Sequence, residues 1–455
     1  MKKAKITFIG AGSVSFCPAT VVDVLQSELF ATIDVEIYLM DIAPKPLELS
    51  KNFCQQLAMR LNRNITIKAS TNLQEAVDGA DFVITAIEKD RMHYWSQDFH
   101  IPRRYGFRQV FGENGGPGSM FHTLRNLPPL LDIAHAMEKG CPNAWMLNYT
   151  NPEHKLVEGV SRLSKTKAIG LCHGEAMGLD QLALFLQMPR EQIIYRSVGL
   201  NHFGWFTKIW DKNTGENLYP KLREMEKMAH PLTKWDEWAL TRIMFRTYGL
   251  WPYPGANHIG EYIAWGSEFL ASSAVQFYFD PAAHNPWETR KPPQFIYSYD
   301  HFPKHDLFEK TKSEDEAYED VFSADKEIRG SGEYGIPIAE AIFFNKPTEI
   351  GSVNMPNKGY AKDLLEDMVI ELPALVDGNG IHPHICDPLP AAVAQMINTQ
   401  GTINRLVIEA YQEQSRNKLL QAVLLDPTVS NYQNAVAMIN ELCELQKDIL
   451  PILKW

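Results

Sequence analysis

The segment Lys5–Phe16, KITFIGAGSVSF, decides the fold class of this chain. Its apolar beginning predicts a short strand, Gly10–Ser13 a tight turn, and the residues after the turn the start of a helix. Glycines permit such a turn and let backbone N–H groups approach a pyrophosphate at the helix N-terminus. Ser15 replaces the third glycine of the usual dinucleotide-binding pattern. The segment therefore predicts an NAD-binding turn, and the alternative is an α/β turn without a ligand.

The next predicted strand, Asp34–Met40, is followed by an acidic residue, Asp41. At this place in a dinucleotide-binding unit, a carboxylate binds the 2′-OH of the NAD ribose. The spacing from the turn is longer than the usual ~20 residues. Ile42 and Ala43 follow, so no arginine stands beside Asp41 to hold the 2′-phosphate of NADP. We therefore expect NAD as the cofactor.

Strand-like and helix-like segments alternate through the first 195 residues, which is typical of βαβ units on a parallel sheet. The predicted strands are Lys5–Ile9, Asp34–Met40, Ile65–Ser70, Asp81–Ile87, Ala144–Tyr149 and Ala168–Cys172. The predicted helices are Pro18–Leu29, Leu47–Leu61, Leu73–Val77, Leu130–Lys139 and Val157–Leu163. The fold class is therefore α/β, with a Rossmann-type doubly wound parallel sheet in an NAD-binding domain of residues 1–195.

The pattern loosens in the second half, residues 196–455, where we expect a mixed α+β domain joined without a flexible linker. The predicted strands there are Gln192–Leu200 and Trp205–Asp211, the predicted helices are Met225–Gly249 and most of Ala317–Phe344, and Ala361–Pro373 joins a helix start to a strand. The last 70 or so residues have helical spacing.

Composition limits the function classes. The 455 residues carry 44 basic and 55 acidic side chains, a formal charge of −11, and no Lys/Arg block, so a nucleic acid or an anionic membrane surface is not expected as a partner. No apolar run approaches the ~18 residues of a membrane span. Six cysteines without a CxxC pair predict reduced thiols rather than a disulfide framework, and hence a cytoplasmic protein.

Four polar motifs follow predicted strands or loops. Asn148–Pro152 (NYTNP) offers two amides for sugar hydroxyls or the nicotinamide, and an Asx turn before proline is the alternative. Cys172–Glu175 (CHGE) offers a thiolate and an imidazole, which suit a borderline divalent metal; a buried cysteine beside a turn histidine is the alternative. Asn201–Trp205 (NHFGW) and Asn257–Tyr262 (NHIGEY) add two further polar clusters. Spacing alone does not bring the four together.

In this order, the motifs resemble glycoside hydrolase family 4 from residue 5 to about 430. The motifs that carry the resemblance are GAGSVSF (Gly10–Phe16), NYTNP (Asn148–Pro152), CHGE (Cys172–Glu175), NHFGW (Asn201–Trp205), GANHIGEY (Gly255–Tyr262), SGEYG (Ser331–Gly335), NxPNxG (Asn354–Gly359) and ELPALVDGNG (Glu371–Gly380). The resemblance implies a lactate/malate dehydrogenase-like fold.

It also implies an NAD-dependent glycosidase, an exception among glycosidases, most of which use paired carboxylates. In the implied route NAD⁺ takes hydride from C3 of the sugar, and a divalent metal, usually Mn²⁺, stabilises the enediolate that forms on loss of the C2 proton. The glycosidic oxygen then leaves, water adds, and the hydride returns, so that NAD is recycled.

The resemblance implies a role for each matching residue. Gly10, Gly12 and Ser13 match the pyrophosphate loop, Asp41 the ribose contact, Cys172 and His202 the metal ligands, and Asn151 the amide that binds the sugar near C2 and C3. We assign Asn148 to the cofactor and Asn201 and His258 to the substrate. His173 matches the position held near the leaving oxygen and is our candidate acid, with Glu175 as the fallback.

The candidate base departs from the family pattern. Many relatives have Gly-Asp-x-His where this chain has Gly255–His258, so the amide of Asn257 occupies the place of a carboxylate and cannot take a proton. Tyr253 or His258 could serve instead, and an engineered aspartate-to-asparagine change at position 257 is a third explanation. A tyrosine base would need a lowered pKa, which a nearby metal could supply.

The Cys-His-Gly pattern resembles family members that act on α-linked uronic acids, glucuronides or galacturonides. A uronate needs an arginine, and the candidates are Arg91, Arg103, Arg104, Arg108 and Arg329. The alternatives are an α-glucosidase or α-galactosidase of the same family, a hydroxy-acid dehydrogenase, and a non-catalytic dinucleotide sensor. We expect a small sugar glycoside as the ligand and a homodimer or homotetramer, with the second domain binding substrate and metal and mediating assembly.

Overall fold

The computed structural model describes residues 2–13, 17–228, 238–269, 274–276, 285–289, 294–296 and 329–455. Its first half contains six parallel strands in the order β3-β2-β1-β4-β5-β6. The strands are β1 (Lys3–Ile9), β2 (Asp34–Met40), β3 (Thr66–Ser70), β4 (Phe82–Thr85), β5 (Trp145–Asn148) and β6 (Lys167–Gly170). The chain reverses direction across the sheet between β1 and β4, and ligands bind at such a switch point in open α/β sheets. The Rossmann-type prediction is confirmed.

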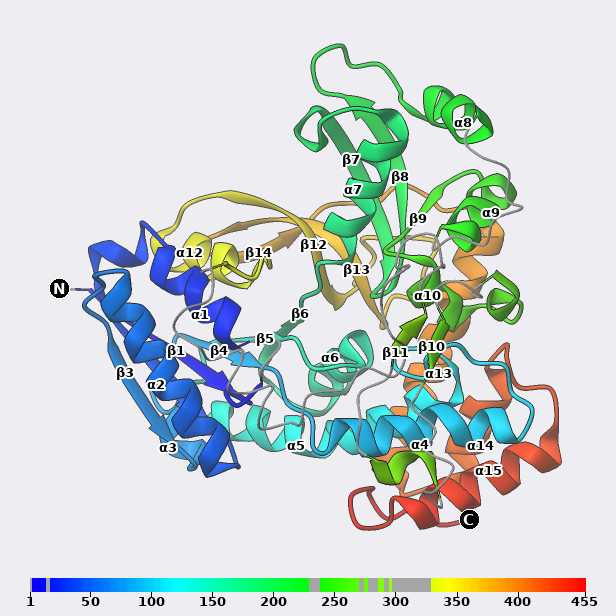
Figure 1. The fold of residues 1–455 in the computed structure, drawn as a ribbon, viewed down its shortest axis with the longest axis horizontal. Coiled ribbons are helices and arrows are strands. Elements are labelled where there is room, and N and C mark those ends of the chain that lie inside the picture. The colour runs from blue at the N-terminus through cyan, green and yellow to red at the C-terminus, as the bar shows by residue number, and fades with distance from the viewer. Residues whose placement is uncertain are drawn as a thin grey trace.

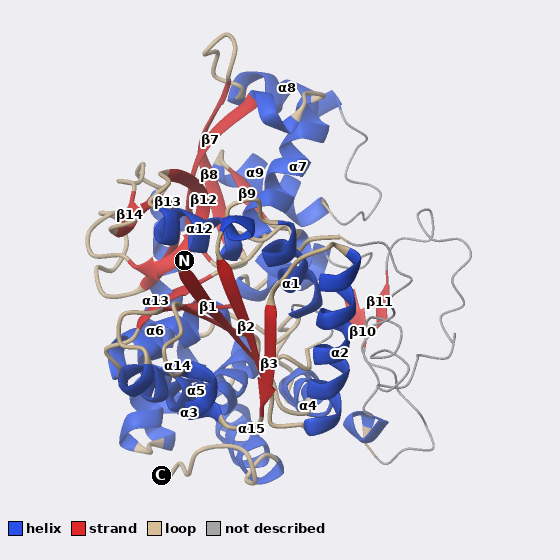
Figure 2. Cartoon of the chain, turned by 90° about the vertical axis from the view of Figure 1, so that its left-hand side faces the viewer, coloured by secondary structure: helices blue, strands red, loops and turns tan. Residues whose placement is uncertain are grey.

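Helices cover both faces of this sheet, as Figure 2 shows with the strands seen along one edge. On one face lie α1 (Cys17–Gln26), α2 (Pro44–Arg60) and α12 (Gly335–Phe344), and on the other α3 (Leu73–Val77), α5 (Gly116–Gly140) and α6 (Glu153–Leu163). The strands are almost continuously apolar because both of their faces are buried, which is typical of parallel sheets.

The sheet continues into the second half of the chain through antiparallel strands. The path of the whole sheet is β3-β2-β1-β4-β5-β6-β12-β13-β7-β8-β9. The added strands are β7 (Ile193–Leu200), β8 (Phe203–Asp211), β9 (Trp251–Tyr253), β12 (Thr348–Pro356), β13 (Val369–Asp377) and β14 (Gly380–Pro383), which pairs with β13. Asn354 on β12 pairs with Gly170 on β6, and Glu371 on β13 pairs with Gly199 on β7. Both halves of the chain therefore contribute to one sheet. A separate antiparallel pair is formed by β10 (Ala274–Gln276) and β11 (Gln294–Ile296).

The remaining helices form two groups in Figure 1. In the upper right, beside β7, β8 and β9, lie α7 (Gly174–Leu186), α8 (Tyr219–Met228), α9 (Ala239–Tyr248) and the short α10 (Ala256–Ile259). In the lower right lie α4 (Arg91–Arg104), α13 (Ala391–Glu413), α14 (Arg416–Leu425) and α15 (Tyr432–Leu445). The lower group packs on α5 and encloses a buried ion pair. Arg125 lies 2.7 Å from Asp98, and both bond to the amide of Gln446.

Several predicted elements differ from the structure. Helix α5 begins at Gly116, well before the predicted Leu130, and it accommodates Pro128 and Pro129. Residues 361–365 form a turn rather than a helix start, because the Asn357 amide bonds the backbone of that segment. Of the predicted helix Met225–Gly249, the structure describes the two ends, which belong to α8 and α9, while residues 229–237 lie outside the described residues. Residues 317–328 of the predicted helix in Ala317–Phe344 also lie outside them. No helix among those described is both long and apolar enough to cross a membrane.

Candidate functional site

The turn after β1 has the close contacts that only glycine permits. Gly10 has a φ of +82°, and a Cβ there would lie 2.1 Å from the carbonyl oxygen of Ala86. The N–H of Gly12 donates to Oδ2 of Asp41 at 2.9 Å, and a Cβ on Gly12 would collide with that carboxylate. The N–H of Ser13 donates back to Gly10. The predicted pyrophosphate loop and the predicted ribose contact therefore lie side by side, in a cradle that fits a dinucleotide.

The two amides of the segment after β5 differ in their surroundings. Asn148 is fully buried, its Oδ1 accepts from Oγ1 of Thr85 at 2.8 Å, and its Nδ2 donates to the carbonyl of Thr150 at 3.0 Å. Its amide therefore holds the turn itself. Asn151 is half-buried, and its Nδ2 donates to Oε1 of Glu113 at 3.2 Å. Glu113 is ion-paired with Arg91.

Arg91 bridges two carboxylates, Glu113 and Glu88, and His122 Nε2 lies 2.9 Å from Glu88. Burial raises the pKa of Glu113, but the charge of Arg91, together with His122, His202 and the hydrogen bond from Arg91, outweighs burial, so that the pKa is lowered. Of the other candidate arginines, Arg103, Arg104 and Arg108 are exposed around the end of α4, and Arg329 is exposed beside the loop before α12. The contacts of Arg91 lead through Glu113 to the amide of Asn151, a predicted sugar-binding residue.

His202 lies in the turn between β7 and β8, in a left-handed conformation with a φ of +65°. Nδ2 of Asn114 donates to its Nδ1 at 3.1 Å, and its ring centroid lies 4.2 Å from that of His258. Burial, with a further contribution from the positive charge that His173 can carry, lowers the pKa of His202 to about 4. The imidazole is therefore neutral near pH 7, which is the form that ligates a metal.

Cys172 follows β6 and is half-buried. Burial and the negative charges of Glu333 and Glu371 raise the pKa of its thiol well above the usual value. A thiolate at this position would therefore need a cation to stabilise it. Among the residues that the structure describes, no three His, Cys, Asp or Glu side chains are grouped to hold a metal ion. The pair of Cys172 and His202 would need non-protein ligands to complete a metal shell.

His173 begins α7 and is exposed. Its Nδ1 lies 2.7 Å from Oε1 of Glu333, and this hydrogen bond raises the pKa of the imidazole. Glu333 is held by Ser331, whose own N–H donates to Asp23 of α1 at 3.0 Å. The fallback acid, Glu175, is fully buried and accepts from the hydroxyl of Tyr334.

The two candidate bases are in different environments. Tyr253 is fully buried on β9, its ring stacked near Phe206 and against Gly204, and burial raises the pKa of its phenol well above 10. His258 is half-buried, and burial, with the positive charge that His202 can carry, lowers the pKa of its imidazole well below 6.5. Its Nδ1–H donates to Oδ1 of Asn257 at 2.7 Å, and its backbone N–H donates to the same oxygen at 3.0 Å. Asn257 therefore orients the imidazole and leaves Nε2 as the basic nitrogen.

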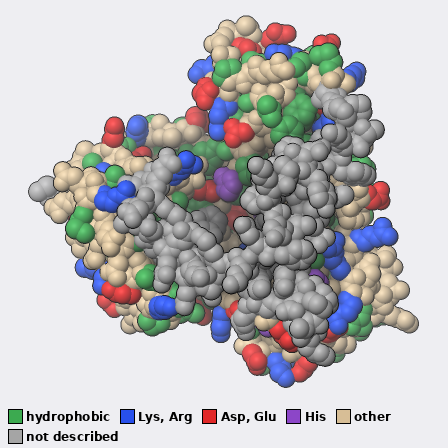
Figure 3. Space-filling view, viewed as in Figure 1, with side chains coloured by type: hydrophobic (Ala, Val, Ile, Leu, Met, Phe, Trp, Pro, Cys, Tyr) green, Lys and Arg blue, Asp and Glu red, His purple; other side chains and the backbone are tan. Residues whose placement is uncertain are grey.

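Asn201, the remaining predicted substrate residue, is fully buried, and its carbonyl accepts from the hydroxyl of Tyr262 at 2.9 Å. In the described part of the chain, its side-chain amide has no hydrogen-bond partner. Figure 3 shows a hollow near the centre of one face of the molecule, with histidine and acidic side chains at its edge. The geometry thus joins Asn151, Glu113, Asn114, His202 and His258 through consecutive contacts.

Four residues that contact the predicted site residues or their neighbours were not predicted from the sequence: Glu113, Asn114, Glu261 and Glu333. The first two lie in Phe111–Ser119 (FGENGGPGS), whose density of glycine around an acid and an amide is the signal that could have found them. Glu261 and Glu333 lie inside motifs that carry the family resemblance, GANHIGEY and SGEYG.

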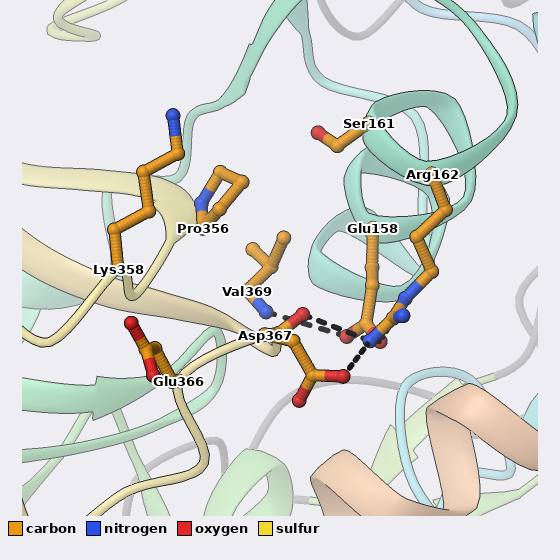
Figure 4. Close-up of a pocket in the computed structure, with 8 residues that line it drawn as sticks. All are labelled: Glu158, Ser161, Arg162, Pro356, Lys358, Glu366, Asp367 and Val369. Atoms are coloured by element: carbon orange, nitrogen blue, oxygen red, sulfur yellow. Dashed lines mark hydrogen bonds and ion pairs between the residues drawn. The ribbon is translucent and has the colours of Figure 1, made fainter.

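An open pocket elsewhere contains none of the predicted site residues. It lies between α6 and the strands β12 and β13 (Figure 4). Its guanidinium, Arg162, bonds Glu158 at 3.0 Å and both the carbonyl and the carboxylate of Asp367. The guanidinium of Arg162 is thus matched by two acids, and none of the predicted site residues lines this pocket, so the contacts around His202 form the better candidate site.

Known proteins resemble this chain over nearly its whole length. The sequence-family model described as Family 4 glycosyl hydrolase matches residues 5–188, and the one described as Family 4 glycosyl hydrolase C-terminal domain matches residues 197–429. An α-galactosidase of Bacillus subtilis (strain 168) is 30% identical over 99% of this chain and 100% of its own. An α-glucosidase of Erwinia rhapontici is 28% identical over 99% of each chain, and an α-galacturonidase of Thermoanaerobacter italicus is 27% identical over 98% of this chain and 97% of its own. The solved structure of a 6-phospho-α-glucosidase from gut microorganisms, in complex with NAD and Mn²⁺, covers all of both chains with a TM-score of 0.79 and 21% identity.

Proposed function

Because the chain belongs to family 4 of the glycosyl hydrolases, we propose that this glycosidase cleaves α-linked uronic acid glycosides, galacturonides or glucuronides, with NAD and a divalent metal such as Mn²⁺. The observation that carries the proposal is the contact series Asn151–Glu113–Arg91, in which one carboxylate connects an arginine to the predicted sugar-binding amide. The Cys-His-Gly pattern and the α-galacturonidase relative support the same substrate class.

The residue types at the two proposed cofactor sites suit their groups. NAD would be held by Gly10, Gly12, Ser13 and Asp41. The metal would be held by Cys172 and His202, and sugar hydroxyls or water would provide its remaining ligands. When bound, NAD accepts and returns a hydride while the metal polarises the neighbouring sugar oxygens.

The side chains around the sugar would move two protons. Nε2 of His258 carries the lone pair that accepts a proton from carbon, because its Nδ1–H is held by Asn257. Tyr253, the other candidate base, would first have to leave its buried position. His173 in its protonated form holds one proton against Glu333 and presents the other at Nε2 to the leaving oxygen. Asn151 would bind the sugar near C2 and C3, with Asn201 beside the metal ligand.

A neutral α-glucoside or α-galactoside is the second candidate substrate, and one observation favours it. The charge of Arg91 is already matched by two carboxylates, Glu88 and Glu113, and Glu333 adds a third acid beside His173. An anionic sugar would have to compete with those acids for Arg91, whereas a neutral sugar would not.

The decisive experiment is an assay of the purified protein with NAD⁺ and Mn²⁺ under reducing conditions, comparing matched 4-nitrophenyl α-glucosides and α-galactosides with α-linked uronides. Preference for the uronide supports the first candidate, and preference for the neutral sugar replaces it with the second. Deuterium from the solvent should enter C2 of the product only when NAD⁺ is present. Net accumulation of NADH would instead indicate a hydroxy-acid dehydrogenase, and no turnover at all would indicate a sensor.

The metal assignment has its own test. Cys172→Ser should weaken Mn²⁺ binding and abolish turnover, whereas Cys443→Ser, a half-buried cysteine of the C-terminal helix α15, should change neither. Full activity of Cys172→Ser without added metal would disprove the assignment. We also propose a homodimer or homotetramer in the cytoplasm, which light scattering and cell fractionation would test.

A further inference from the structure

Glu261 makes contacts that the proposed chemistry does not use. It lies in the 3₁₀ turn η3 (Gly260–Tyr262), and its side chain is fully buried. Its Oε2 accepts from three consecutive backbone N–H groups, those of Glu113, Asn114 and Gly115, at 2.9, 2.8 and 3.1 Å. One carboxylate oxygen thus holds the whole loop that precedes α5.

The loop and the 3₁₀ turn also meet backbone to backbone. A Cβ on Gly115 would lie 2.6 Å from the carbonyl oxygen of Glu261, closer than any real Cβ contact. The φ of Gly115 is −130°, which every residue type adopts, so glycine is needed here for the close approach and not for its conformation. The position of the loop is therefore fixed by Glu261 from two directions.

The held loop presents Asn114 to the predicted metal ligand His202. Nδ2 of Asn114 lies 3.1 Å from Nδ1 of His202, and the second oxygen of Glu261, Oε1, lies 3.9 Å from the same nitrogen. The neighbouring Tyr262 donates its hydroxyl to the carbonyl of Asn201 at 2.9 Å. Glu261 and Tyr262 thus hold the two segments that set the orientation of the His202 ring.

The turn that carries His202 needs such support. A residue other than glycine at a φ of +65° is strained, and the surrounding contacts must offset this strain. Oδ1 of Asn114 has no partner among the described residues, so a half-turn of its amide would let it accept a hydrogen bond from Nδ1–H of His202. That tautomer places the lone pair of His202 on Nε2, the form that ligates a metal.

We propose that Glu261 is a positioning residue for the metal site: it fixes loop 113–115, and through Asn114 it orients His202 so that Nε2 can ligate the metal. The proposal rests on the assignment of His202 as a metal ligand in the proposed function. It requires that loss of the carboxylate disturbs loop 113–115 and His202 and leaves the dinucleotide turn, which follows β1, unchanged.

Three variants test this inference by binding and by amide hydrogen exchange. Glu261→Ala should weaken Mn²⁺ binding at least tenfold by calorimetry and leave NAD binding within twofold of the wild type. The amides of residues 113–115 should exchange at least tenfold faster. Glu261→Gln keeps one acceptor oxygen, so its Mn²⁺ affinity and its exchange rates at residues 113–115 should lie between those of the wild type and Glu261→Ala. This variant keeps the test valid if the alanine variant fails to fold. Glu158→Ala is the matched control, because Glu158 is another buried carboxylate that accepts a backbone N–H, from Val369, outside the site.

The outcomes separate the inference from the proposed function. Unchanged Mn²⁺ affinity, or unchanged exchange at residues 113–115, in a folded Glu261→Ala would overturn the positioning role. Equal losses in Glu261→Ala and Glu158→Ala would also overturn it, since the effect would then be general destabilisation. If the wild type itself binds no Mn²⁺, the metal assignment fails, and with it the role of Glu261 toward the metal.

Discussion

Oε1 of Glu333 lies 2.7 Å from Nδ1 of His173, although the two residues are 160 positions apart in the chain. The contact brings the loop before α12 against the N-terminus of α7. Because Ser331 of the same loop is bonded to Asp23 on α1, the candidate acid is connected to the first helix of the dinucleotide unit.

We expect Glu333→Gln to lower the pKa of His173, because the hydrogen bond to the carboxylate is what raises it. The protonated acid would then be lost at a lower pH, so the alkaline limb of the pH profile of kcat/KM should move to lower pH. Activity near pH 8 should fall by about tenfold, which is less than the roughly 10²–10⁴-fold that a positioned acid contributes, because the acid is weakened and not removed. Glu340→Gln, which alters an acid of α12 bonded to Ser27, is the control. An alkaline limb that does not move would contradict the assignment of His173 as the acid.

Gly12→Ala should weaken NAD binding. The new Cβ would lie 2.9 Å from Oδ2 of Asp41 and would push that carboxylate away from the turn. A loss of affinity of at least about tenfold, roughly 1.4 kcal/mol, should appear in a fluorescence titration with NADH. Asp41→Asn should weaken binding as well, with an unchanged melting temperature. Wild-type affinity in both variants would mean that NAD binds elsewhere.

Arg125→Ala should destabilise the protein strongly. It would leave Asp98, which is fully buried, without its ion-pair partner, and such losses cost about 3–5 kcal/mol of unfolding free energy. Arg104→Ala removes an exposed arginine that pairs with Glu441, and should cost about 1 kcal/mol or less. Denaturant unfolding of the two variants measures the difference. Similar losses of unfolding free energy would show that the buried ion pair contributes no more to stability than the exposed one.

Glu371→Gln should change how stability depends on pH. Burial raises the pKa of Glu371 from 4.5 to about 7 in the folded protein, so the folded state keeps a proton that the unfolded state releases. This contribution to stability is complete below pH 4.5 and is lost as the pH rises through about 7. The neutral glutamine does not titrate. The unfolding free energy of the variant should therefore rise relative to that of the wild type between pH 4.5 and 7, by up to about 3 kcal/mol. The exposed Glu349→Gln should show no such gain. A constant difference between Glu371→Gln and wild type in thermal unfolding at several pH values would show that Glu371 does not titrate in this range.

The parallel strands were predictable because burial on both faces leaves a clear apolar pattern. The strand Asp34–Met40 and the helix Leu73–Val77 have the predicted bounds. Helix α4 was not predicted, because its sequence, RMHYWSQDFHIPRR, mixes charged and apolar residues without a marked apolar stripe. The start of α5 was hidden by glycine and proline, which usually mark loops. The family resemblance carried by the motifs is confirmed.

Candidate site residues could be chosen from the sequence where they lie within three residues of the end of a strand, as Gly10, Asp41, Asn151 and Cys172 do. They could not be chosen where a side chain arrives from a distant loop. Glu261 reaches residues 113–115 across about 147 positions, and Glu333 reaches His173 across 160. No local pattern records such a contact, because it is created by the packing of the two halves. The roles of these residues stay predictions for the experiments above.

The single sheet also determines when the protein can fold during synthesis. Strand β6 ends at residue 170, but its neighbour β12 begins at residue 348, so a ribosome adds most of the second half while the edge of β6 has no partner. Unpaired edges attract other strands, and nascent chains of this length expose them for many seconds at about 5–20 residues per second. We therefore expect the isolated N-terminal half to aggregate, and chaperones to matter most for chains halted between those two points.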